Sequence, residues 1–255
     1  MDLPAARAVV PRLEVLARTG STNADLRAHA ADASGWPHLS TIVTRDQTAG
    51  RGRLDRTWSA PAGAALAVSV LVRREVDPAL RGWIPLLAGV AMADAVAAQL
   101  PAHRVGVKWP NDVLVDEFKM CGILAEATPE AIVVGAGVNT AMTRAQLPVP
   151  TATSFAVLGE RADEDRLLAA YLAEVGRHLE ELIAAGNAVD SGLHARATRR
   201  SATLGGPVRV SLPGDRSLEG IAHRLDHEGR LVVVDGSGEH VVAAGDVIHV
   251  RAAAV

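Results

Sequence analysis

The chain has 255 residues, which is enough for one large domain or for one domain with a small module. Its 49% apolar and 22% charged residues are typical of a folded soluble protein, and a net charge of −3 argues against a general nucleic-acid binder. The single cysteine, Cys121, excludes an intrachain disulfide. The N-terminus lacks a signal-peptide pattern and no apolar run reaches about 18 residues, so we expect a cytoplasmic protein that does not span a membrane.

The first hundred residues contain signals for a helix, two strands and a second helix. Periodicity and turn signals predict these elements, in that order, over residues 24–33, 40–48, 64–73 and 77–100. Thr22 and Asp25, three residues apart, approximate a capping box at the start of the first helix. Pro85 lies inside the second helix and is a candidate site for a kink, because proline removes a backbone hydrogen bond.

A group of strands is predicted in the middle of the chain. Short apolar segments separated by turns predict strands over residues 105–109, 112–117, 119–127 and 131–139. Strands grouped in this way, with few helices between them, favour a mixed or largely antiparallel sheet over a doubly wound one. The clearest helix follows, from Asp163 to Ala185 with Gly186 as its C-cap, and a shorter helix is predicted over residues 191–200.

The composition changes at residues 204–207, Leu-Gly-Gly-Pro. Five short β-type runs come after this point, separated by glycine-rich turns, over residues 208–212, 218–225, 230–234, 239–244 and 247–250. Turn signals at this density predict a small closed β-module of roughly 50 residues. We therefore predict two domains, residues 1–203 and residues 204–255.

The segment Gly50-Arg51-Gly52-Arg53 alternates glycine with arginine. It would let backbone N–H groups approach an anion closely while two guanidinium groups neutralise its charge. A flexible basic surface loop is the alternative interpretation of these four residues alone. Gln47 upstream and Trp58 downstream favour a binding loop, because an indole ring can stack on an adenine or cover the loop.

A second polar stretch contains Lys108, Asn111, Asp112 and Lys119. Pro110 restricts the residue before it to extended geometry, so the Asn-Asp pair is interpreted as a tight polar turn between strands. A hairpin turn with a surface lysine is the alternative. Two cationic stretches flanking a short polar turn, in a chain this apolar, suggest a site that handles phosphate and a carboxylate.

The segment Thr151-Ala152-Thr153-Ser154 is interpreted as structural, and the glycines within residues 135–139 are expected to leave room for a flat ligand beside their strand. The triplet at residues 21–23 is an N-cap by default, and the glycines within residues 135–139 lack the third glycine of a dinucleotide fingerprint. The chain has no Walker-type phosphate loop and no zinc-binding motif, and His223 and His227 are predicted to face solvent. Cys121 is either an inert core thiol, which is the favoured interpretation, or a reactive thiol beside cations.

The two polar stretches, GRGR and KWPND, closely resemble the biotin protein ligases. This resemblance implies an α+β catalytic domain with a mixed sheet, of the class II synthetase-like biotin ligase fold, followed by a small SH3-like barrel. It implies that biotin is activated with ATP and Mg²⁺ to biotinyl-5′-AMP. The biotinyl group would then pass to a lysine of a biotin carboxyl carrier domain, as in a biotin–[acetyl-CoA-carboxylase] ligase.

The resemblance also assigns roles to matching positions. It implies that Lys119, Arg53 and Asp112 serve catalysis, with Lys119 bridging the biotin carboxylate and the phosphate. The positions that would bind biotin are Ser21, Thr22, Asn23, Gln47, Gly50, Arg51, Gly122, Gly135 and Gly137. The positions that would bind ATP are Arg51, Arg53, Trp58, Lys108, Asn111, Asp112, Lys119 and Asn139. No protein metal site is expected, because Mg²⁺ would arrive with the nucleotide, although Asp112 is a candidate to help place it.

The chain departs from the family pattern at two positions. Asp55 replaces the usual glycine of the arginine-rich loop, and Cys121 replaces the usual alanine. The first motif begins at Ser21, so we expect a short form without a DNA-binding domain. Two alternatives stay open: a lipoate- or octanoate-type ligase or acyltransferase, and a non-catalytic sensor of biotin or nucleotide.

Overall fold

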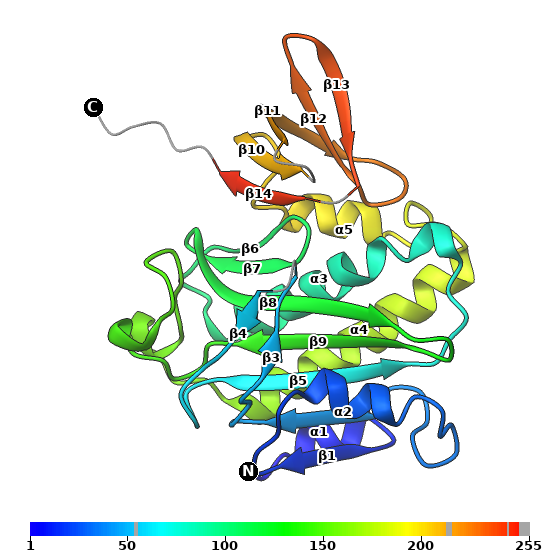
Figure 1. Ribbon diagram of the computed structural model, residues 1–255, viewed down its shortest axis with the longest axis vertical. Coiled ribbons are helices and arrows are strands. Elements are labelled where there is room, and N and C mark those ends of the chain that lie inside the picture. The colour runs from blue at the N-terminus through cyan, green and yellow to red at the C-terminus, as the bar shows by residue number, and fades with distance from the viewer. Residues whose placement is uncertain (54–55, 213–215, 244, 250–255) are drawn as a thin grey trace.

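The computed structural model describes residues 1–53, 56–212, 216–243 and 245–249. Within these ranges a seven-stranded sheet with its helices is followed by a five-stranded sheet at one end of the molecule (Figure 1). The fold is α+β, a mixed-sheet domain with a C-terminal SH3-like module, as the sequence predicts. Asp55, which replaces the family's glycine, lies outside the described residues.

The larger sheet has the order β1-β2-β5-β9-β8-β7-β6. Its strands are β1 (Leu13–Leu16), β2 (Thr41–Thr44), β5 (Leu66–Val72), β6 (Val105–Lys108), β7 (Asp112–Val115), β8 (Phe118–Ala127) and β9 (Ile132–Val138). The pair β1–β2 is parallel and the other pairs are antiparallel, which confirms the predicted mixed sheet. A separate two-stranded hairpin is formed by β3 (Gly50–Arg51) and β4 (Thr57–Trp58).

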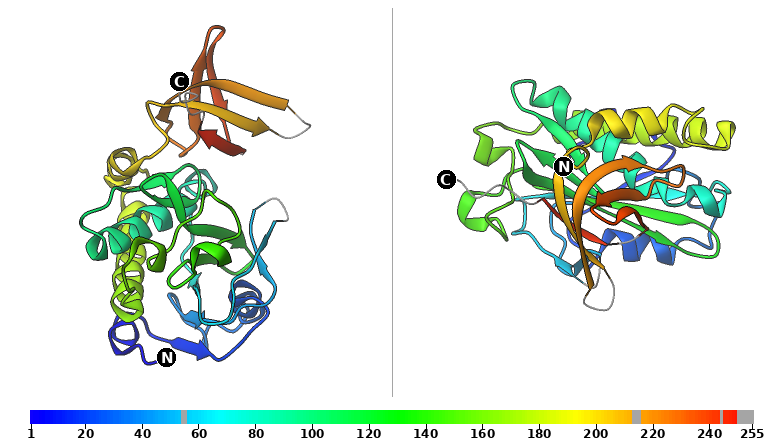
Figure 2. Two further views of the ribbon diagram at one scale, coloured as in Figure 1. Left: turned by 90° about the vertical axis from the view of Figure 1, so that its left-hand side faces the viewer. Right: turned by 90° about the horizontal axis from the view of Figure 1, so that it is seen from above.

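Helices cover the larger sheet on both faces. They are α1 (Pro4–Val9), α2 (Thr22–Ala28), α3 (Trp83–Gln99), α4 (Glu164–Ala185) and α5 (Leu193–Arg200), with 3₁₀ turns at Pro78–Leu80, Arg144–Gln146 and Ala156–Leu158. The long helices α3 and α4 lie on one side of the sheet, while α2 and the β3–β4 hairpin lie on the other (Figure 2). Among the helices in the described part of the chain, none is long and apolar enough to span a bilayer.

Strand alternation gives the two faces of this sheet different side chains. The face toward α3 and α4 carries packed apolar residues, among them Val68, Val70 and Ile123. The opposite face carries Ser69 and two glycines, Gly135 and Gly137, beside the cluster that packs on α2. Small residues on one face therefore let side chains from other segments lie close to the strands, while the other face is filled by apolar side chains of the core.

The predicted helix ends differ from the structure at several places: α2 ends at Ala28 instead of residue 33, and α3 begins at Trp83 instead of residue 77, after a separate 3₁₀ turn. Ser21, not Thr22, is the N-cap of α2, and its Oγ accepts a hydrogen bond from the Ala24 N–H at 3.4 Å. Asp25 accepts from the Thr19 hydroxyl at 2.5 Å instead of closing a capping box. In the second helix, Pro85 lies in the first turn of α3, where the N–H groups have no helical partner, so the suggested interior kink was wrong.

The predicted α4 is confirmed at both ends. The Asp163 side chain accepts from the Arg166 N–H at 3.1 Å, and Gly186 ends the helix in the left-handed conformation with φ 66°. The short helix α5 begins at Leu193, after Gly192, rather than at Ser191. These two caps set the length of α4, which packs against α3 on one face of the sheet.

The five-stranded sheet is antiparallel, in the order β13-β12-β11-β10-β14. Its strands are β10 (Pro207–Leu212), β11 (Arg216–Leu225), β12 (Leu231–Asp235), β13 (Gly238–Val242) and β14 (Asp246–His249). Two buried indoles join it to the larger domain: Trp109 Nε1 donates to the Gly229 carbonyl and Trp83 Nε1 to the His227 carbonyl, each at 2.9 Å. The side chains of His223 and His227 are exposed, as predicted.

Candidate active site

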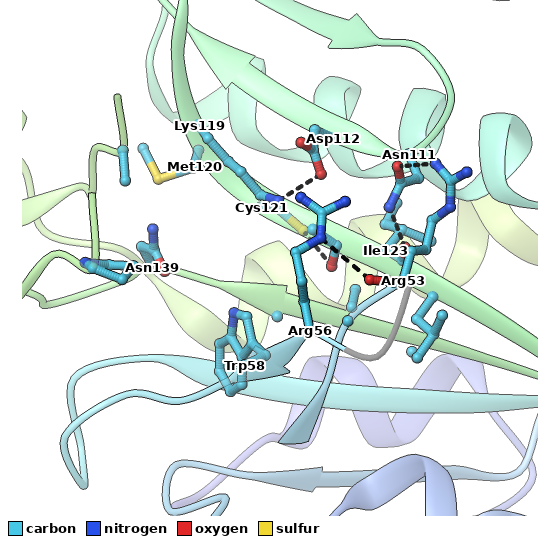
Figure 3. A pocket seen from close by; sticks show the side chains of 18 of the residues that line it. Arg53, Arg56, Trp58, Asn111, Asp112, Lys119, Met120, Cys121, Ile123 and Asn139 are labelled. Atoms are coloured by element: carbon cyan, nitrogen blue, oxygen red, sulfur yellow. Dashed lines mark hydrogen bonds and ion pairs between the residues drawn. The ribbon is translucent and has the colours of Figure 1, made fainter. Parts of the chain in front are cut away.

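A cavity of about 740 Å³ opens on the sheet face that carries the glycines. Its walls come from the β3–β4 hairpin, the β6–β7 turn, strands β8 and β9, the start of α2 and strand β14. Arg53 and Lys119, which the sequence places far apart, both line it (Figure 3). The two cationic stretches therefore converge on one site, which is the arrangement that a phosphate and carboxylate site requires.

The structure brings together nearly all the predicted site residues. Those that line the cavity are Ser21, Thr22, Asn23, Gln47, Arg51, Arg53, Trp58, Lys108, Asn111, Asp112, Lys119, Gly122, Gly135, Gly137 and Asn139. Gly50 does not line it. It is buried in the hairpin, where a Cβ would lie 2.6 Å from the Trp58 carbonyl oxygen and would also clash with the Gln47 amide.

The floor of the cavity follows from strand register. Gly122 on β8 pairs with Gly137 on β9, and Gly137 pairs with Ala67 on β5, so three neighbouring positions on one face have almost no side chain. The sequence suggested that such glycines leave room for a flat ligand. In this structure the room is occupied by protein: a Cβ at Gly137 would lie 2.5 Å from the Trp58 indole, and one at Gly135 would clash with the Asn23 amide.

Lys119 and Asp112 form the ion pair at the centre of the cavity. Lys119 Nζ lies 2.7 Å from Asp112 Oδ1 (Figure 3). The lysine backbone is fixed by the segment at residues 151–153: its N–H donates to the Thr151 carbonyl and its carbonyl accepts from the Thr153 N–H, each at 2.8 Å. The sequence treated this segment as structural, and the contacts show that it holds Lys119 in place.

Arg53 reaches across from the hairpin to the β6–β7 turn. Its Nη1 donates to Asn111 Oδ1 at 3.0 Å (Figure 3), and its Nη2 donates to the Gly245 carbonyl at 3.1 Å. The Asn111 amide is oriented from behind, because its Nδ2 donates to the Ile123 carbonyl at 2.7 Å. The guanidinium thus ties the hairpin to both domains, which rules out a detached surface loop for Arg53.

At the other end of the cavity the polar groups are buried and bonded to one another. The Thr22 N–H donates to Gln47 Oε1 at 2.9 Å, and the Thr22 hydroxyl lies 2.7 Å from the Ser69 hydroxyl. Asn139 lies away from this end, next to Met120 on β8; it is also buried, and its Nδ2 donates to the Thr153 carbonyl at 2.9 Å. Buried polar groups bonded in this way are held rigid, so this end is suited to recognising a ligand with fixed donors and acceptors.

The structure favours the interpretation of Cys121 as an inert core thiol. It pairs with Val138, and its buried side chain belongs to the core packed against the helices, although the residue also lines the cavity. Burial raises the pKa of the Cys121 thiol to about 12, although Lys119 opposes the shift. The thiol therefore stays protonated and unreactive at neutral pH.

Sequence reasoning missed several residues that line the cavity. Arg56 follows the glycine–arginine segment and accepts, through its carbonyl, from the Gly52 N–H at 2.6 Å, so its place in the loop was a usable signal. Glu117 sits in the β7–β8 turn, beside the predicted strand end. His249 belongs to the last strand of the second sheet, and no pattern in the sequence links it to this site.

Comparisons with known proteins agree with this geometry. A model of the biotin/lipoate A/B protein ligase family matches residues 15–139, and a model of the biotin protein ligase C-terminal domain matches residues 203–250. A biotin–[acetyl-CoA-carboxylase] ligase of Mycobacterium tuberculosis is 41% identical, covering 94% of this chain and 90% of the relative. One of Paracoccus denitrificans is 33% identical, covering 91% of this chain and 98% of the relative.

Solved structures give the same fold. The biotin protein ligase of Aquifex aeolicus, in complex with biotin and ATP, superposes with a TM-score of 0.78 at 22% identity, covering 95% of this chain and 100% of that one. The Leishmania major enzyme in complex with biotinyl-5-AMP gives a TM-score of 0.61 at 25% identity, covering 95% and 99%. On the sequence relatives above, the chain belongs to the biotin protein ligase family.

Proposed function

We propose that this protein is an ATP-dependent biotin–[acetyl-CoA-carboxylase] ligase. A biotin carboxylate oxygen attacks the α-phosphorus of ATP, pyrophosphate leaves, and biotinyl-5′-AMP is formed. The ε-amine of a carrier-domain lysine then attacks the acyl carbon, and AMP leaves. The observation that carries this proposal is the convergence of Arg53 and Lys119 on one cavity, in a chain whose relatives are named for this reaction.

The roles follow from where the charges lie. Two anions must be held together while negative charge accumulates around phosphorus, so fixed cations contribute most when they face the reacting atoms. Lys119 is proposed to exchange its contact with Asp112 for the carboxylate and the phosphate as the anhydride forms. Arg53, held by Asn111, is proposed to retain the adenylate.

The two ends of the cavity are proposed to bind the two substrates. The buried end, with Ser21, Thr22, Asn23 and Gln47, would take the ureido ring of biotin, which offers two N–H donors and one carbonyl acceptor. The remaining proposed contacts to biotin are Arg51, Gly122, Gly135 and Gly137, which line the cavity, whereas the buried Gly50 is proposed only to let the Gln47 amide and the Trp58 backbone lie close to the hairpin. The open end would take the nucleotide, with Trp58, Lys108, Asn111 and Asn139.

Mg²⁺ is proposed to enter with the nucleotide and to neutralise phosphate charge. Asp112 and Glu117 are carboxylates that line the cavity, and Mg²⁺ prefers oxygen ligands. The acceptor lysine comes from the carrier domain, so no nucleophilic side chain is required here. We place the reaction in the cytoplasm, because a lone free cysteine fits a reducing compartment.

Intact-mass spectrometry of a biotin carboxyl carrier domain tests this proposal. Incubation with this protein, biotin and ATP should add one biotinyl group, and omission of ATP should abolish the addition. A carrier whose acceptor lysine is replaced by arginine is the matched control and should stay unmodified. No mass change with the intact carrier would contradict the proposal.

A lipoate- or octanoate-type ligase is separated by substrate. Pyrophosphate release should appear with biotin and not with octanoate or lipoate. The reverse preference would support that alternative, which shares the family model matched by residues 15–139. Biotin binding without pyrophosphate release would instead indicate a sensor.

A further inference from the structure

Glu126 is a charged residue on β8 that the sequence motifs did not single out. Its side chain is only 18% exposed and accepts from donors on two separate segments, α2 and the β3–β4 hairpin. Asn23 Nδ2 lies 2.7 Å from Oε2, while Arg27 Nη1 and Arg51 Nη2 lie 3.1 and 3.0 Å from Oε1. A carboxylate with two guanidinium partners and one amide donor is strongly held, because charge-assisted hydrogen bonds are the strong ones.

The amide nitrogen of Asn23 is fully used by this arrangement. Its Oδ1 accepts from the buried Ser69 hydroxyl at 2.6 Å, so its nitrogen must point the other way. That nitrogen donates to Glu126 and, at 3.3 Å, to the Leu124 carbonyl. Ser69 and Glu126 therefore fix the orientation of Asn23 from opposite sides, and Asn23 lies next to Thr22 at the buried end of the cavity.

The Gln47 side chain makes a second connection between the same two segments. Gln47 accepts from the Thr22 N–H, and its amide nitrogen lies over Gly50, where a Cβ would clash with it. The neighbouring residues Thr22 and Asn23 are thus linked to the neighbouring residues Gly50 and Arg51 by two side chains. The Gln47 link is neutral, and the Glu126 link carries charge.

We propose that Glu126 is a positioning residue that couples the segment at residues 21–23 to the glycine–arginine hairpin, an inference that rests on the proposed function. Glu126 holds the Arg51 side chain, which is 45% exposed, against β8. The hairpin is then ordered before biotin arrives. A hairpin without this anchor would have to be ordered on binding, which weakens affinity.

Limited trypsin digestion of the ligand-free protein is the first test. Glu126→Gln keeps the size of the side chain and an acceptor for Asn23, but it removes the charge that holds Arg51. We expect cleavage within the hairpin to become about tenfold faster, since a loosened arginine-rich loop is more open to protease. Arg27→Gln is the matched control: it removes the outer guanidinium, leaves the Arg51 contact, and should be cleaved in the hairpin like the wild type.

Biotin binding and turnover form the second test. Glu126→Gln should raise the Kd for biotin about tenfold, while kcat for adenylate formation stays within about twofold. In the Arg51→Gln background the same substitution should add little, because residues that act through one contact are not additive. Unchanged hairpin cleavage and unchanged biotin affinity would overturn the proposal, as would fully additive effects.

The two proposals fail separately. The digestion needs neither biotin nor ATP. A wild-type protein that makes no biotinyl-AMP would therefore contradict the proposed function without contradicting the positioning role of Glu126. Equal hairpin cleavage in the wild type and in Glu126→Gln, with ligase activity present, would contradict the positioning role of Glu126 without contradicting the proposed function.

Discussion

The two faces of the seven-stranded sheet use the same strands for opposite purposes. On the face toward α3 and α4, Val70, Cys121 and Ile123 are packed into a continuous core. On the other face, Gly122, Gly135 and Gly137 let polar and aromatic side chains lie against the strands beside the cavity. Cys121 and Gly122 are sequence neighbours, yet one supports the fold and the other the site. Substitutions on the two faces should therefore fail in different ways.

The largest effect is expected on the site face, from Lys119→Ala. Loss of the cation should slow adenylate formation at least about 10²-fold, because its charge matters most as the anhydride forms. Biotin affinity should change far less, and thermal stability should be retained because this side chain is partly exposed. Pyrophosphate release at saturating substrates, compared with calorimetric biotin binding, measures the two quantities. Near-normal turnover would show that the role given to Lys119 is wrong.

The next effect belongs to the core face. Val70 is fully buried among apolar residues, and Val70→Ala removes two methyl groups and leaves a void. We expect the free energy of unfolding to fall by about 2 kcal/mol in urea denaturation. The KM values for biotin and ATP should stay at the wild-type level. A changed KM in Val70→Ala with an unchanged free energy of unfolding would contradict the assignment of this face to stability rather than to the site.

A smaller effect is expected from Gly137→Ala. The added methyl would lie 2.5 Å from the Trp58 indole and would push that ring away from the sheet. We expect the KM for ATP to rise about tenfold, since small displacements of ligand-contacting groups are costly. Gly236→Ala is the matched control, because nothing lies within 4 Å of a Cβ there, and it should behave as the wild type in steady-state kinetics.

The smallest effect concerns Cys121 at alkaline pH. Burial holds the thiol protonated to about pH 12 in the folded protein, whereas in the unfolded chain it ionises at its ordinary, lower pKa. The unfolded state therefore binds fewer protons above that pKa, and stability falls as pH rises, by about 1 kcal/mol per pH unit for this group. Urea unfolding at pH 7 and pH 10 should show a shallower loss for Cys121→Ala. An equal pH dependence of the free energy of unfolding in the wild type and in Cys121→Ala would contradict this prediction.

Most of the site could be predicted from the sequence, because its charged and polar residues lie in a few short segments. GRGR, KWPND and the lysine before Gly122 are short segments whose charge and turn residues sit beside one another in the chain. The sequence alone predicts Arg51, Arg53, Lys108, Asn111, Asp112 and Lys119 as site residues, and all of them line the cavity, whereas Gly50 does not. Helix ends were less well predicted: the side chains of Thr22 and Asp25 have other polar partners close by in space, and these outweigh the local cap pattern.

The sequence by itself determined the residue types of the site, the mixed sheet and the second β-module, because periodicity and turn signals act over a few residues. Only the tertiary structure decided that the glycines hold Trp58 and Asn23, and that Glu126 joins two distant segments. It also decided that His249 reaches the cavity. These contacts depend on strand register and on the docking of one sheet beside another, and neither is encoded by the residues around them.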